Sequence, residues 1–95
     1  MTHMLRLDVP MLPSGFRLHW DKVRDRWVLL FPEGAIGLNP TAVSVLELCD
    51  GKRTIEEIAD ELSKKFNGAD IHADVEKLLL DLANRGMVID ASTSS

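Results

Sequence analysis

Apolar and polar residues alternate over the first third of the chain in the way that strands require. Residues 16–20, FRLHW, alternate between the two types, which is typical of a strand with one buried face. Residues 27–31, WVLLF, are apolar on both faces. The polar residues 21–25 join these runs, and a turn at 32–34 leads into the short run 35–38. The pattern predicts a small antiparallel sheet whose third strand lies at an edge.

After residue 38 the apolar residues recur every three or four positions, which is the spacing of helices. Asn39 is a suitable N-cap for a first helix. Thr54 and Glu57 have the spacing of a capping box at the start of a second helix. A third helix opens at or just after Asp70 and stops at Gly86, because glycine suits the residue past a helix end. Its expected buried stripe is Ile71, Val75, Leu78, Leu79 and Leu82.

These elements predict an α+β fold that resembles a winged helix, with a small antiparallel N-terminal β-sheet of three strands followed by three α-helices. Residues 1–14 lack a period and contain two prolines, so we expect a flexible N-terminal arm. Residues 87–89 favour β structure and predict a short terminal strand. The folded domain is expected over 15–90, and 91–95 are expected to form a disordered tail.

Composition and charge narrow the classes of function. A chain of 95 residues fits one domain, and its 45% apolar content is enough for a core. The net charge of -4 argues against nucleic acid as a partner, because phosphates attract dense Lys and Arg. No apolar run approaches the roughly 20 residues that span a bilayer, and no secretory signal is present. With one cysteine and therefore no internal disulfide, we expect a cytoplasmic protein that does not bind membranes.

The chain lacks the clusters of side chains that catalysis or metal binding needs. Its histidines, His3, His19 and His72, are scattered over the arm, a strand and the third helix. Cys49 falls on the apolar face of the first helix, which favours a small buried side chain over a reactive thiolate. No Cys or His pair has the spacing of metal ligands, and no glycine-rich loop precedes a helix. We expect a protein that is not an enzyme and holds no cofactor and no metal.

The predicted third strand offers an unprotected edge. Its residues, Ala35, Ile36, Gly37 and Leu38, include no lysine or proline to block pairing. The unpaired N–H and C=O groups of such an edge can template another extended chain. A peptide, the protein's own arm or a second copy can each cover it.

A second surface feature lies on the third helix, where Leu80 points almost opposite the centre of the buried stripe. It is expected to be exposed, with Glu76 and Ala83 close to it. A binding contact, an isolated surface leucine and a leucine covered by the arm all fit this pattern.

Motifs spread over residues 10–88 carry a resemblance to a known family. They are Leu29-Leu30, Pro32-Glu33, Leu38-Asn39, Leu46, Leu48-Cys49-Asp50-Gly51, Ile58, Leu62 and Asp74-Val75. Each motif alone is common, but their joint order and spacing are specific. The chain resembles the PqqD family of the pyrroloquinoline quinone (PQQ) pathway. The resemblance implies a peptide chaperone that binds the precursor peptide PqqA and hands it to the radical SAM enzyme PqqE, and related domains, called RiPP recognition elements, take the leader segment as an added strand.

Carried onto this sequence, the resemblance implies a peptide paired along residues 35–38 and packed against the third helix. The helix residues expected at the peptide are Val75, Glu76, Leu79, Leu80 and Ala83. For Val75 and Leu79 the alternative is a place in the core, and for Glu76 a solvated helix face. The enzyme-facing surface is assigned to a mixed-charge hairpin, Asp21, Arg24, Asp25 and Arg26, for which the alternative is a solvated turn.

Two other functions stay open on the residues alone. A winged-helix DNA-binding regulator would read DNA with the third helix, where Asp70, Asp74, Glu76 and Asp81 would repel phosphates. A structural homodimer would bury the edge strand and Leu80 against a second copy. The dimer and the peptide chaperone do not exclude each other.

Overall fold

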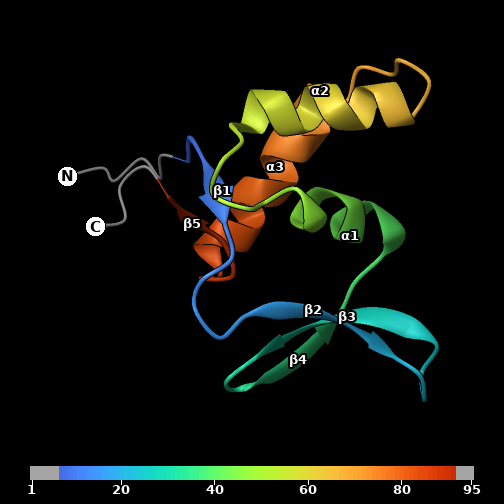
Figure 1. Cartoon of the computed structure of the whole chain (residues 1–95), viewed down its shortest axis with the longest axis vertical. Coiled ribbons are helices and arrows are strands. Elements are labelled where there is room, and N and C mark those ends of the chain that lie inside the picture. Colours follow the sequence, from blue (N-terminus) through green and yellow to red (C-terminus); the bar gives the residue numbers. More distant parts are fainter. Residues whose placement is uncertain (1–6, 92–95) are drawn as a thin grey trace.

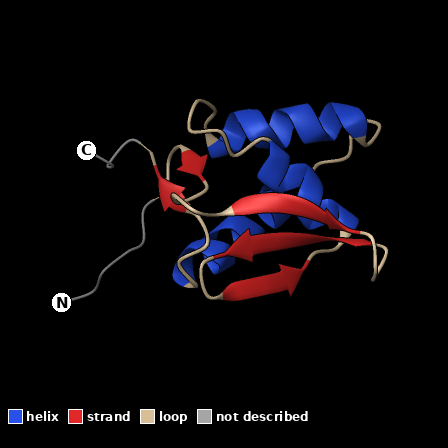
Figure 2. Cartoon of the chain, turned by 60° about the horizontal axis from the view of Figure 1, so that its bottom comes forward, coloured by secondary structure: helices blue, strands red, loops and turns tan. Residues whose placement is uncertain are grey.

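The computed structural model describes residues 7–91, which form a helical layer and a sheet layer (Figures 1 and 2). The elements in chain order are β1 (Pro10–Met11), β2 (Arg17–Asp21), β3 (Arg26–Phe31), β4 (Gly34–Gly37), α1 (Pro40–Glu47), α2 (Ile55–Lys65), α3 (His72–Asn84) and β5 (Ile89–Asp90). Figure 2 shows β2, β3 and β4 as one sheet in front of the helices, with the short β1–β5 pair to one side.

The three-stranded sheet has the order β2-β3-β4, so β4 is an edge strand as predicted. Both pairings are antiparallel, and Leu29 of β3 lies opposite Leu18 of β2 and Ile36 of β4. Residues that lie opposite one another point to the same face, so these three share the inner face, where Leu29 is 0% exposed. Two aromatic pairs continue this face, Phe16 with Phe31 (ring centroids 5.5 Å apart) and Trp20 with Trp27 (5.6 Å).

The helices form where the sequence supplies caps and an apolar stripe. The Asn39 side chain accepts a 2.7 Å hydrogen bond from the Ala42 amide, and Thr54 and Glu57 form the expected capping box.

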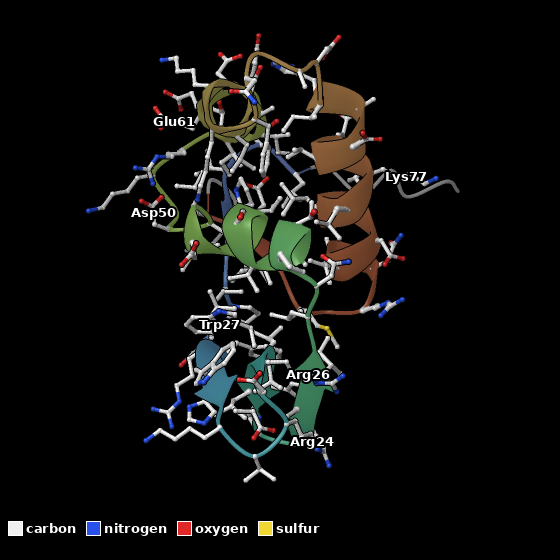
Figure 3. The ribbon with its side chains drawn as sticks, turned by 90° about the vertical axis from the view of Figure 1, so that its right-hand side faces the viewer. Arg24, Arg26, Trp27, Asp50, Glu61 and Lys77 are labelled. Carbon is white, nitrogen blue, oxygen red and sulfur yellow. The ribbon has the colours of Figure 1, made fainter. Side chains whose placement is uncertain are left out.

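The core lies among the helices and extends to the inner face of the sheet. Figure 3 shows Trp27 between the sheet and α1. The buried residues of the main core are Leu7, Val45, Leu46, Cys49, Ile58, Ala59, Leu62, Val75, Leu79, Leu82 and Val88. The structure thus confirms the α+β class and the order of three strands before three helices, while the closer likeness to a winged helix stays a prediction.

Residues 7–14, predicted to belong to a flexible arm, are built into the domain from Leu7 onward. Leu7 is 8% exposed and lies in the core, and β1 pairs antiparallel with β5. The Asp90 carboxylate accepts hydrogen bonds from the Asp8 and Val9 amides at 3.2 and 3.1 Å. The prolines that exclude a helix here leave an extended segment that suits a strand. Residues 1–6 of the expected arm and 92–95 of the expected tail lie outside the described residues.

A histidine joins α2 to the start of α3. His72 Nε2 lies 2.9 Å from Asp60 Oδ1 on α2, and His72 Nδ1 lies 3.2 Å from Asp70 Oδ1 in the preceding loop. The hydrogen bond to Asp70, followed by the interaction with Asp60, raises the pKa of His72 above 6.5. His72 in its charged form therefore links the two helices.

Replacing Asp90 with Ala should destabilise the domain, because the Asp8 and Val9 amides would lose their acceptor in a partly buried place. We expect the free energy of unfolding in urea to fall by about 1–3 kcal/mol. Asp90→Asn, which keeps one acceptor oxygen, is the matched control and should lose less. Equal stability of Asp90→Ala and the wild type would show that this carboxylate does not hold the N-terminal segment.

The stabilisation that His72 provides should depend on pH. Because its pKa is raised in the folded state, the contribution is complete below the unfolded pKa of about 6.5 and is lost as pH rises through the folded value. Urea unfolding of the wild type and His72→Gln should therefore show a larger difference at pH 5.5 than at pH 8.5. A difference that does not change with pH would contradict the charged link.

Candidate functional site

The outer edge of β4 carries free backbone groups at Ala35 and Gly37. The Leu38 amide donates to the Trp27 carbonyl at 2.9 Å, which fixes the alternation of hydrogen bonds between β3 and β4. In an antiparallel pair, the backbone groups of every second residue bond to the neighbouring strand. Because those of Leu38 do so, the N–H and C=O groups of Ile36 also point toward β3. Ala35 and Gly37 therefore direct their N–H and C=O groups outward, away from β3. Of the edge predicted over 35–38, two residues thus point their backbone N–H and C=O groups outward, and the other two point these groups toward β3.

One flank of α3 lines a cavity that also includes residues at the start of α1. Asp74 and Leu78, one helical turn apart, line a cavity of about 400 Å³ together with Asn39, the N-cap of α1, and Thr41 in its first turn. We call Asp74 and Leu78 the Leu78 flank. The rest of the lining is mainly apolar, namely Val45, Leu62, Phe66, Ile71 and Val75. Figure 3 shows α3 on the same side of the molecule as β4, with α3 above the strand.

The predicted helix residues Glu76, Leu80 and Ala83 lie on the other flank of α3. Glu76 lines a groove with Leu7 and Asp8, close to the start of α2. Leu80 and Ala83 follow Glu76 by one and two helical turns, so they share its flank. We call these three residues the Glu76 flank. The structure separates them from the side of α3 that adjoins Asn39 and Thr41.

Two expectations for the helix need correction. Val75 and Leu79 are 3% and 0% exposed, so they belong to the core, which was the alternative to a peptide contact. Leu80 is partly buried and packs against the core rather than standing free as an exposed leucine. The helical-wheel argument placed Leu80 opposite the stripe, but it did not include the packing of other segments around α3.

Leu78 and Phe66 are the residues that the sequence argument did not place at the site. Leu78 had been assigned to the buried stripe, but it is only partly buried and lines the cavity. Phe66, the residue that ends α2, is 39% exposed at the same cavity. No signal in the sequence singles out Phe66, because isolated apolar side chains at the surface are common.

Figure 3 shows the β2–β3 hairpin, with Arg24, at the bottom of the view and α2 at the top. The Asp21 carboxylate accepts from the Val23 and Arg24 amides at 3.0 and 3.3 Å, and Asp25 has a positive φ of 54°. These two acidic residues shape the turn, as Asp often does. Arg24 is exposed, and Val23 at the tip is 94% exposed.

Cys49 is buried and lies beside an acidic residue. Burial, together with the negative Asp50 beside it, raises the pKa of the Cys49 thiol to about 12, so the thiol is protonated at neutral pH. No three His, Cys, Asp or Glu side chains within 7–91 are grouped to hold a metal ion. None of the helices over this range is long and apolar enough to cross a bilayer.

Known proteins resemble this chain in sequence and in structure. The family model described as coenzyme PQQ synthesis protein D (PqqD) matches residues 26–88. A "PqqA binding protein" of Rhodopseudomonas palustris is 43% identical over 84 residues, which cover 86% of this chain and 82% of the relative. The bifunctional coenzyme PQQ synthesis protein C/D of Methylorubrum extorquens is 44% identical over 80 residues, which are 82% of this chain and 22% of that longer protein.

A solved structure has the same fold. The solution NMR structure of the PqqD truncation of Methylobacterium extorquens PqqCD, a stand-alone RiPP recognition element, superposes with a TM-score of 0.71 at 40% identity. The match covers 84% of this chain and 87% of that one. The family model, the relatives and the shared fold agree, and we conclude that the chain belongs to the PqqD family.

Proposed function

We propose that this protein is a peptide chaperone of PQQ biosynthesis that binds the precursor peptide PqqA by strand addition to β4 and presents it to the radical SAM enzyme PqqE. A relative is named a PqqA binding protein, and the structural neighbour is described as a recognition element for ribosomally made peptides. The chain then supplies binding and no catalysis, which agrees with a buried, protonated thiol as its only cysteine.

The observation that carries the proposal is the outward edge of β4. Ala35 and Gly37 each offer an N–H and a C=O to a neighbouring strand, and the added backbone bonds would fix the register of the peptide. Strand addition extends a sheet that already exists, so the binding surface needs little rearrangement. Backbone pairing supplies affinity without regard to sequence, and side-chain contacts must then supply selectivity.

The cavity on the Leu78 flank can provide part of that selectivity. It opens where the chain leaves β4 at Asn39, so a peptide that runs along the edge and continues past Leu38 reaches it. Its apolar lining favours a leucine-sized or aromatic side chain over a charged one. We therefore place the peptide between the β4 edge and the Leu78 flank, where Val75 forms part of the cavity wall, and not on the Glu76 flank.

Presentation to PqqE requires a second surface that the peptide leaves free. The hairpin tip, with Val23 and Arg24 exposed, contributes no residue to the cavity. Asp21, Arg24 and Asp25 of the hairpin therefore remain our proposal for the enzyme-facing surface, whereas Arg26 lies against β4.

Strand addition can be tested with Ala35→Pro, which removes an outward N–H without touching the bonds to β3. We expect the affinity for synthetic PqqA from the same organism to fall about tenfold, since one edge hydrogen bond is lost and the proline ring obstructs pairing. Isothermal titration calorimetry measures the affinity. Ala35→Ser keeps the N–H and is the control.

The same titration followed by backbone amide NMR should shift residues 35–38 and the Leu78 flank together. Unchanged amide chemical shifts in β4 at saturating peptide would rule out strand addition. Light scattering over a range of protein concentrations distinguishes a peptide-free edge from an edge that pairs with a second copy.

The two flanks of α3 can be compared with Leu78→Asp and Leu80→Asp, a matched pair of partly buried leucines on one helix. If the peptide uses the cavity, Leu78→Asp should weaken PqqA binding by about tenfold, because a charge replaces the apolar wall. Leu80→Asp should weaken binding much less. Circular dichroism verifies that both variants fold, and a larger loss for Leu80→Asp would move the site to the Glu76 flank.

A further inference from the structure

Gly37 of β4 lies in contact with a side chain of the neighbouring strand β3. Its φ is not in the left-handed region, in contrast to Gly34, Gly51 and Gly86. A Cβ built on Gly37 would instead overlap the Cζ and Nη2 atoms of Arg26. The Arg26 guanidinium therefore lies against the Gly37 backbone and occupies the space that any other side chain would take.

The register of the sheet explains this contact. Gly37 lies opposite Val28, and Arg26 is two residues before Val28 on β3, so all three point to the outer face of the sheet. The Arg26 side chain thus leans diagonally across β4 toward the edge where Gly37 offers its backbone groups. Figure 3 shows Arg26 beside β4, below α3.

The Arg26 side chain is exposed, and its guanidinium has no carboxylate partner within residues 7–91. Asp21 lies opposite Arg26 on β2, but its Oδ1 accepts from two amides of the hairpin turn. A guanidinium that lies at a strand edge, with its N–H donors in a planar fork, is suited to bind a carboxylate on an added neighbouring strand.

We propose that Arg26 is a specificity-determining residue for the peptide and selects a Glu or Asp at the peptide position beside Gly37. The inference rests on the proposed strand addition. Residues side by side on neighbouring strands point to the same face, whether the strands are parallel or antiparallel. The peptide residue beside Gly37 therefore projects onto the outer face, next to the Arg26 guanidinium.

The same geometry predicts the residues around this acidic position. The peptide residues immediately before and after it point to the inner face, toward Ile36, Leu38 and the helices. Apolar side chains fit there. The preferred peptide therefore has an acidic residue with an apolar residue on each side. Its inner face is recognised by apolar packing and its outer face by the charge of Arg26.

The test is a double-mutant cycle between the protein and the peptide. Synthetic PqqA from the same organism is compared with variants in which each Glu or Asp is changed, one at a time, to Gln or Asn. Affinities are measured for the wild type and Arg26→Met, since methionine keeps an apolar stem over Val28 but lacks the charge. We expect one peptide position at which either single change weakens binding about three- to tenfold and the double change costs no more than either alone.

A matched control is Arg17→Met, which removes a charge from the same face of the sheet at the opposite edge strand. It should leave the affinity for every peptide unchanged. Arg26→Glu should prefer the peptide with Lys at the coupled position, and the coupling should decrease as salt increases.

Each outcome separates this inference from the function on which it rests. If the peptide shifts the amides of residues 35–38 but Arg26→Met shows no coupling to any acidic position, strand addition stands and the role of Arg26 is overturned. Equal losses for Arg17→Met and Arg26→Met at all positions also overturn it, because they show only general attraction. If PqqA does not bind, or binds without shifting β4, both proposals fail.

Discussion

The hydrogen bond from the Leu38 amide to the Trp27 carbonyl sets the phase of the β3–β4 pairing, and the arrangement of the site depends on that phase. A slip of one residue would exchange the two faces of β4 and turn Ile36 away from the helices. The buried Leu29 opposite Ile36 opposes such a slip, because an apolar contact on the inner face would be lost. Packing on one face of the sheet thus determines which backbone groups are free at its edge.

Much of the fold could be predicted because local chemistry and tertiary structure agree. Asn39 and the Thr54–Glu57 capping box mark helix starts that the structure confirms, and the strand order follows from two short turns. The free edge of β4 could also be predicted, since an edge strand without lysine or proline is visible in the sequence.

The parts that could not be predicted depend on contacts between distant segments. The segment around Pro10 has no period of its own, and it is ordered by residues at the other end of the chain, such as Asp90. For the helix, the wheel of α3 identifies its buried centre but does not say which flank adjoins β4. Leu78 and Leu80 are both off-centre leucines, and only the position of Asn39 and Thr41 distinguishes them. The contact between Arg26 and Gly37 likewise needs the register of β3 against β4.

The N-terminal segment also sets where the domain can be cut or joined to another protein. The carbonyls of Asp8, Val9 and Pro10 accept hydrogen bonds from the amides of Ile55, Ala91 and Gly51, and Leu7 fills part of the core. A chain that started at residue 15 would leave those amides without acceptors and the core without Leu7. In a fusion of this domain to another protein, a flexible linker should therefore end before Leu7, because the sheet and helices need this segment to complete their hydrogen bonds and core.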